Sequence, residues 1–189
     1  MAEHALKEWA VTVEALARGD QVLIIRKGGI GEKSFSLPHS RFFLFPTYEH
    51  QRPELVKDAH RDDFRGALEQ REDPDLLPLP AFAELIASHP IADPDALDAL
   101  DPLHILTPDY AAERLRWRRK HPLWAAVLRV WRCVPPPVLP VGSEHGGCVS
   151  WIDLPGDIAV PELAPALDDA AFRHEAGAVE RVLAELAAT

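Results

Sequence analysis

The chain has 189 residues and a formal net charge of −10, a size that suits one compact domain and is short for two. Its composition, 47% hydrophobic and 26% charged, excludes a disordered chain, a coiled coil and a collagen-like repeat. No apolar run approaches the roughly 20 residues that cross a bilayer, and the first residues lack the pattern of a signal peptide. We therefore predict a single domain over residues 1–189 with no membrane segment. Because there are two cysteines and no export signal, we also predict a cytoplasmic location.

Residues 1–37 contain no proline, although the whole chain holds 18 prolines. Apolar residues at helical spacing predict a helix over residues 3–18, and Gly19 suits its C-terminal end. The run over residues 21–25 is apolar on both faces and predicts a buried strand. A second short strand is expected over 42–45, followed by a surface helix over 52–68.

In the rest of the chain prolines recur at short intervals. Each one removes a backbone hydrogen-bond donor and fixes φ, so the helices and strands there are expected to be short. Residues 81–91 are compatible with a helix or a strand, and Pro90 with the residues that follow favours the strand. Asp93-Pro94 and Thr107-Pro108 each combine an N-cap residue with proline at the first helical position, and they predict helices over 93–100 and 107–119. Strands are expected over 123–134 and 149–152, and a helix or helix pair over 166–186. Because the strands and helices do not alternate strictly, the pattern favours an α+β domain with a small mixed or antiparallel curved sheet, or a barrel, flanked by short helices.

The segment Phe45-Pro-Thr-Tyr-Glu-His-Gln51 stands out just after an apolar strand. It presents an aromatic ring, a carboxylate, an imidazole and an amide in immediate succession, a set that can recognise a small planar polar ligand by stacking and hydrogen bonding. The structural alternative is a capped helix start with Thr47 as the N-cap.

Charge is segregated along the sequence. Residues 54–101 hold thirteen acidic residues, whereas residues 114–152 hold one, Glu144. The later segment interleaves arginines with Trp117, Trp124 and Trp131, a pattern typical of nucleic-acid surfaces. The alternative is a solvated face whose tryptophans point inwards and whose arginines pair with acids.

Several catalytic and metal-binding chemistries are excluded by spacing. Cys133 and Cys148 form no CxxC pair, so a structural zinc site is not expected. Residues 28–34 resemble a phosphate-binding loop, but no glycine directly precedes Lys33. Neither a GxSxG elbow nor a cysteine in a nucleophile context is present. We predict no metal and no cofactor, and the sequence favours a protein that is not an enzyme.

The chain resembles a bacterial domain family of unknown function. The resemblance rests on Ala5-Leu-Lys-Glu-Trp-Ala-Val11, on Val22-Leu-Ile-Ile-Arg-Lys-Gly-Gly29, on the Phe45–Gln51 segment and on Gly147-Cys-Val-Ser-Trp151. Members of that family are found beside restriction-endonuclease-like domains, which implies a link to DNA restriction.

The opening of the chain is also similar to ASCH domains, PUA-like β-barrels that bind RNA or modified bases. Gly19 and Arg26 match the spacing of the ASCH motif, whereas Gln21 and Ile24 replace its lysine and glutamate. The resemblance implies a PUA-like barrel.

Our leading hypothesis is a non-catalytic module that binds a nucleic acid or nucleotide-like ligand. In it Arg26, Lys27, Arg116 and Arg119 meet phosphates, Tyr48 and Trp151 stack on a base, and Glu49, His50 and Gln51 bind its edge. The full sets are, for the ligand, Arg26, Lys27, Gly28, Gly29, Tyr48, Glu49, His50, Gln51 and Trp151, and, for the nucleic-acid backbone, Arg116, Arg119 and Lys120. One alternative is an enzyme acting on a small nucleotide or phosphorylated substrate, with Glu49 and His50 as acid and base. Another is a protein-interaction subunit that uses the acidic middle segment.

Overall fold

The computed structural model describes residues 4–27, 36–69, 73, 75–116, 122–142, 145–147 and 149–187. In that part of the chain a curved sheet of seven strands forms the framework. Its strands, from one edge to the other, are β2 (Leu23–Arg26), β6 (Leu123–Val134), β5 (Ala81–Ile91), β3 (Arg41–Thr47), β1 (His4–Trp9) and β8 (Trp151–Asp153), with β9 (Glu162–Pro165) paired to β6.

Strand pairing makes the sheet mixed. β1 and β3 run parallel, with Leu6 opposite Leu44, and the other pairs are antiparallel. Between the described residues of β2 and β8 no ladder forms, so the sheet curves without closing. The predicted α+β class is confirmed, in the form of a curved mixed sheet.

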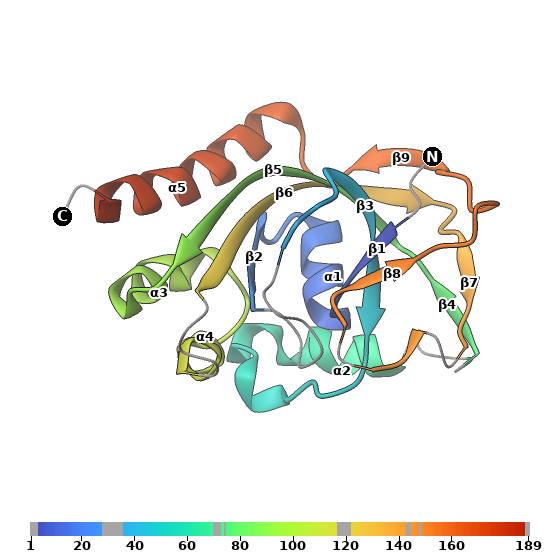
Figure 1. Ribbon diagram of the computed structural model, residues 1–189, viewed down its shortest axis with the longest axis horizontal. Helices are drawn as coiled ribbons and strands as arrows, with labels where there is room; N and C mark the ends of the chain where they lie inside the picture. Colours follow the sequence, from blue (N-terminus) through green and yellow to red (C-terminus); the bar gives the residue numbers. More distant parts are fainter. Residues whose placement is uncertain are drawn as a thin grey trace.

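Helix α1 (Ala10–Arg18) lies inside the curve of the sheet, where β5 and β6 arch over it (Figure 1). It is apolar nearly all round, and six of its nine residues are buried, including Thr12. A helix of this kind is expected where it is enclosed on several sides. Gly19 ends it in the left-handed conformation, with φ 82°.

Strand β1 corrects the prediction of one helix over residues 3–18. The helix begins at Ala10, and the preceding residues form a buried strand between β3 and β8. Lys7 and Glu8 are buried there, at 7% and 2% exposure. Because these side chains are polar, the sequence pattern of the segment matched that of a helix with one polar face. Pairing with two strands that are distant in sequence decides the structure instead of local propensity.

The other helices surround the sheet. α2 (Arg61–Glu69) packs on α1, while α3 (Pro94–Leu100), α4 (Pro108–Arg116) and α5 (Asp169–Ala187) gather near one end of β5 and β6 (Figure 1). The helix expected over 52–68 is instead two 3-10 turns, Pro53–Leu55 and Asp58–His60, followed by α2. The predicted N-cap at Asp93 is confirmed, because its carboxylate accepts a hydrogen bond from Asp95 N at 3.0 Å.

A two-stranded ribbon of β4 (Leu76–Pro78) and β7 (Val138–Pro140) lies at the other end of the molecule (Figure 1). The ribbon and β9 were not predicted, because each is three or four residues long and contains proline. As for membranes, none of the described helices combines the length and the apolar character that a bilayer span requires.

Candidate functional site

Two hollows lie on either side of the segment that follows β3. The β3 hollow, about 200 Å³, is lined by Lys7, Phe45, Pro46, Thr47, Tyr48, Glu49, Leu77, Val141, Gly142, His145 and Gly146. The α4 hollow, about 410 Å³ and more open, is lined by Trp9, His50, Arg52, Leu55, Tyr110, Glu113 and Arg114.

His50 marks the point where the segment turns from one hollow to the other. It adopts a positive φ of 58°, which is uncommon for a residue with a side chain. Thr47 caps no helix here, because its hydroxyl donates to the Glu8 carbonyl oxygen at 3.2 Å. The predicted recognition segment is therefore split, with Tyr48 and Glu49 in the β3 hollow and His50 in the α4 hollow.

The α4 hollow has an aromatic floor. The rings of Trp9 and Tyr110 meet edge to face with centroids 5.0 Å apart, and the Arg114 guanidinium lies 4.3 Å above the Tyr110 ring. Burial raises the pKa of Tyr110 to about 12, and the nearby Arg114 guanidinium opposes this effect only in part. Its hydroxyl is buried and protonated at neutral pH, and the Arg114 guanidinium is the group close to it, although no described group meets full hydrogen-bond geometry with that oxygen.

The rim of the α4 hollow carries an ion pair between Arg52 and Glu113. Arg52 Nε also lies 3.8 Å from Glu54. Arg52 and Glu113 are about half-exposed, at 45% and 46%. Their charged groups are therefore accessible to a ligand from solvent.

Beneath this region lies a buried ion pair that joins two strands. Arg26, at the end of β2, places a guanidinium nitrogen 3.3 Å from the carboxylate of Glu8 on β1. Arg26 also donates to Ser150 Oγ at 3.1 Å, and Glu8 accepts from the Trp9 amide at 2.8 Å. Arg26 thus ties the two strands together, whereas we expected it to meet a phosphate.

Lys27 also has a structural partner. Its ammonium donates to the carbonyl oxygens of Arg114 and Leu115, at 2.9 and 3.1 Å. These carbonyls belong to the last turn of α4, where a cation complements the helix dipole. Lys27 is only 3% exposed, and burial lowers its pKa. This arrangement differs from the expected phosphate contact.

The other predicted residues lie apart. Gln51 accepts from the Val11 amide at 3.5 Å, at the start of α1. Trp151 donates to the Ser36 carbonyl oxygen at 3.0 Å and packs edge-on against Phe42. Arg116 is exposed at the end of α4. Four further predicted residues, Gly28, Gly29, Arg119 and Lys120, lie outside the described residues.

In the β3 hollow a buried lysine is combined with aromatic rings. Lys7 donates to the carbonyl oxygens of His145 and Gly147, the second at 3.1 Å. Phe45 stacks near His145 with ring centroids 6.2 Å apart. The sequence analysis missed Lys7 and His145, since no local pattern indicates that they meet.

The α4 hollow was also missed, although one signal was available. Tyr110, Glu113 and Arg114 are spaced i, i+3 and i+4 after the Thr107-Pro108 helix start, so they share one face of the helix. Trp9, by contrast, comes from β1, and only the fold brings it to this face.

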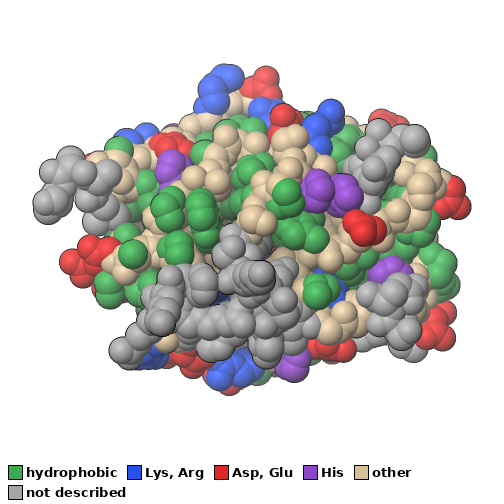
Figure 2. All heavy atoms as spheres, viewed as in Figure 1, with side chains coloured by type: hydrophobic (Ala, Val, Ile, Leu, Met, Phe, Trp, Pro, Cys, Tyr) green, Lys and Arg blue, Asp and Glu red, His purple; other side chains and the backbone are tan. Residues whose placement is uncertain are grey.

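The basic, tryptophan-rich segment divides between surface and interior. On β6, Trp124 and Trp131 are partly buried against the core, and Arg129 pairs with Asp169. Arg116 and Arg132 are exposed. On the face drawn in Figure 2, basic and acidic side chains are interspersed. The tryptophans of β6 therefore point inwards, as the structural alternative to a nucleic-acid surface predicted. The end of α4, in contrast, presents basic charge to solvent.

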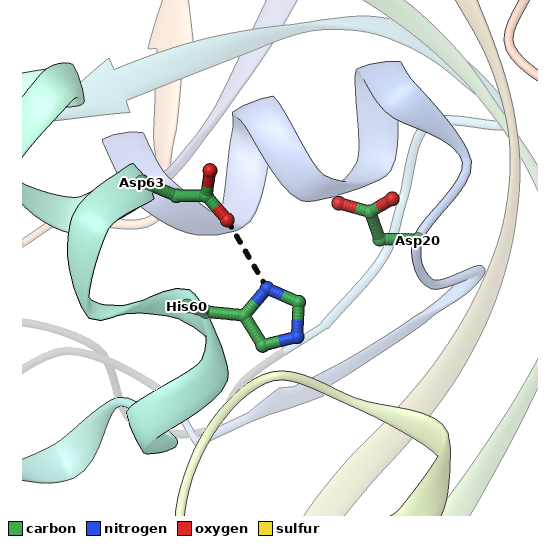
Figure 3. A group of neighbouring side chains, drawn as sticks. All are labelled: Asp20, His60 and Asp63. Carbon is green, nitrogen blue, oxygen red and sulfur yellow. Dashed lines mark hydrogen bonds and ion pairs between the residues drawn. The ribbon is translucent and has the colours of Figure 1, made fainter.

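One cluster has the residue types of a metal site. Ligand atoms of Asp20, His60 and Asp63 lie within 4.8 Å of one another. Figure 3 shows Asp63 and His60 turned toward each other, with Asp20 beside them on the segment after α1. Arg18 pairs with both carboxylates, at 2.7 Å to Asp20 and 2.9 Å to Asp63. The cluster is thus an ion-pair network that joins α1 to α2.

Comparison with solved structures finds ASCH proteins. The crystal structure of ASCH from Zymomonas mobilis has 14% sequence identity and a TM-score of 0.47, over 82% of this chain and 88% of the other. Two mutant structures of the same protein have 15% and 12% identity and TM-scores of 0.44 and 0.45, each over 82% of this chain and 92% of the other. At this level the likeness indicates nothing about ligand or activity.

The curated proteins contain no match to this chain. A protein-family match spans nearly all of it, over residues 5–178. This confirms the predicted membership of a family of unknown function: the chain belongs to the family described as domain of unknown function DUF1802.

Proposed function

We propose that the protein binds single-stranded nucleic acid, with one nucleotide seated in the α4 hollow. The observation that carries the proposal is the combination, in one accessible hollow, of two aromatic rings with the guanidinium groups of Arg52 and Arg114. Single-strand binding uses stacking surfaces for bases and cations for phosphates.

Stacking in this hollow would use Arg114, because Trp9 is only 7% exposed. Tyr110 is 1% exposed, and Arg114 covers its ring. A guanidinium plane supported by an aromatic ring is itself a surface on which a base can stack.

The strand would leave the hollow along α4. Arg116, two residues after Arg114 at the end of α4, is exposed. The sequence continues with Arg118, Arg119 and Lys120. Phosphates would meet this run of cations. Because the net charge is −10, the long-range field repels a polyanion, so binding depends on local contacts and on low salt.

The geometry favours binding over turnover. Glu49 and His50, the candidate acid and base, line different hollows. General acid–base catalysis needs both groups within reach of one substrate. The link to DNA restriction that the family resemblance implies stays a prediction.

A salt titration tests the proposal. Fluorescence anisotropy of a labelled mixed-sequence single strand, with a duplex in parallel, measures affinity from low to physiological salt. We expect tighter binding of the single strand, with log K falling linearly as log salt rises. Absence of binding at low salt would overturn the proposal.

Matched variants locate the site. Arg114→Ala should weaken binding about tenfold or more, because stacking is worth roughly 1–3 kcal/mol per base, and Arg52→Ala should also weaken binding because it removes a cation from the hollow. Arg65→Ala is the control: Arg65 is 71% exposed on α2 and pairs with Asp62. Equal losses in all three variants would indicate a diffuse charge effect and would contradict a seated nucleotide.

A further inference from the structure

We infer that the nucleotide seated in the α4 hollow is a guanosine. This inference rests on the proposed function and names the base that the site selects. It comes from the Arg52–Glu113 ion pair at the rim, together with the stacking surface that Arg114 provides over Tyr110.

The ion pair presents two kinds of group side by side. The Arg52 guanidinium is a planar fork of donors, and the Glu113 carboxylate carries two acceptors. Both side chains are about half-exposed, so a ligand can reach them. A ligand that bridges the two would replace their mutual contact with hydrogen bonds to each group, so neither charged group would lack a hydrogen-bond partner.

Guanine offers the complementary pattern along one continuous edge. Its N7 and O6 atoms accept, and the adjacent N1–H and exocyclic amino group donate. The arginine fork matches N7 and O6 in a bidentate contact. The carboxylate then accepts from N1–H and the amino group, which lie next along the same edge.

The other bases match fewer groups. Cytosine offers one donor group followed by two acceptors, so it can bond both side chains with three groups instead of four. Along their polar edges adenine and uracil present an acceptor, a donor and another acceptor in turn. At least one of these groups would therefore face a side-chain group with which it cannot form a hydrogen bond. We therefore expect the affinity order guanosine, then cytidine, then adenosine and uridine.

The position of the rim pair supports this assignment. Arg52 reaches the hollow from the segment after β3, and Glu113 reaches it from α4. Glu113 directly precedes Arg114, whose guanidinium lies over the Tyr110 ring. Because Glu113 and Arg114 line the same hollow, we expect the edge of a base stacked on Arg114 to meet the Glu113 carboxylate.

The test uses single-stranded uridine oligonucleotides whose central residue is guanosine, adenosine, cytidine or uridine, at low salt. The guanosine strand should bind at least about fivefold tighter than the adenosine strand, the discrimination of one bidentate contact. Equal affinity for all four strands overturns the inference and leaves the proposed function standing. Absence of binding to any strand overturns both.

Two variants assign the contacts. Glu113→Gln should lower the affinity for the guanosine strand until it is close to that for the adenosine strand, and Asp62→Asn, which breaks an exposed pair with Arg65, should leave the guanosine preference intact. A guanosine preference that survives Glu113→Gln overturns the inference.

Modified bases assign the atoms. Replacing guanine by 7-deazaguanine removes N7 and should weaken binding of the native protein several-fold. In Arg52→Lys, which lacks the bidentate fork, the same replacement should have little effect. An unchanged affinity of the native protein for the 7-deaza strand contradicts the arginine contact.

Discussion

Lys27 Nζ donates a hydrogen bond of 2.9 Å to the carbonyl oxygen of Arg114. The contact joins the end of β2 to the last turn of α4, and a second hydrogen bond, to Leu115, completes it. Arg114 forms part of the α4 hollow. A buried lysine directly after β2 therefore helps to determine where a residue of the candidate site lies.

Removing that ammonium should destabilise the protein. Lys27→Met leaves two helix-terminal carbonyls without their donor, and hydrogen bonds to charged groups contribute about 1.5–3 kcal/mol. Because burial of the charge offsets part of this gain, we expect a loss of about 1–2 kcal/mol, measured by urea unfolding. Arg65→Met, at an exposed position of α2, is the control and should change little. A Lys27→Met protein as stable as the native one would contradict the structural role.

The buried pair of Glu8 and Arg26 provides a second prediction. Glu8→Gln removes the negative charge and leaves the Arg26 guanidinium, which is 11% exposed, without its counter-charge. Breaking a buried pair from one side costs about 3–5 kcal/mol, and we expect the free energy of unfolding to fall by about 3 kcal/mol.

A double variant separates charge from packing. Glu8→Met combined with Arg26→Met removes both charges, so it should recover most of the stability that Glu8→Gln loses. Urea unfolding of the three proteins makes the comparison. If the double variant is less stable than the single one, the charge explanation is wrong.

The long elements of the fold could be predicted from the sequence. β5 and β6 were predicted at their observed bounds, although the sequence of residues 81–91 was also compatible with a helix and only Pro90 and the residues after it favoured the strand. β1 could not be predicted, because its buried Lys7 and Glu8 depend on partners far along the chain. No local pattern indicates an ion pair between residues 8 and 26.

The site was predicted only in part, for a related reason. The Phe45–Gln51 segment does line hollows, but its residues divide between two of them. Trp9 was assigned to the apolar face of a helix, and Tyr110 was not singled out. These two rings meet 5.0 Å apart because β1 and α4 pack together, a long-range contact that spacing cannot indicate.

Two glycines in different settings should respond to alanine with opposite signs. Gly19 has φ 82°, and a Cβ there would lie 2.6 Å from Leu167 Cδ2 and 2.7 Å from its Cγ. The left-handed conformation alone costs a side-chain residue roughly 1–2 kcal/mol. Gly66, inside α2, has open space around it, so alanine there should gain about 0.5–1 kcal/mol from helix propensity.

Denaturant unfolding measures both variants. We expect Gly19→Ala to lose about 2 kcal/mol, from conformational strain and from contact with Leu167. Adding Leu167→Ala tests the contact, because it should leave the conformational strain and remove the collision. A Gly19→Ala protein that equals the native one in stability would mean that the backbone at this turn relaxes freely.

His104 should make stability depend on pH between about 4 and 6.5. Burial, together with the nearby Lys57 ammonium, lowers the pKa of His104 to about 4. Its Nδ1 accepts from the Leu106 amide at 3.2 Å, so the folded protein holds the imidazole neutral. In the unfolded chain the pKa returns to about 6.5.

The sign follows from proton binding. Between these two pKa values the unfolded chain binds a proton that the folded protein excludes, so stability falls as the pH falls. The contribution is fully present above pH 6.5 and amounts to about 3 kcal/mol, lost by about pH 4. His104→Asn keeps an acceptor near the Leu106 amide but does not titrate. Over this range its unfolding free energy should fall less steeply than that of the native protein, and parallel pH curves for the two proteins would exclude His104 as the source.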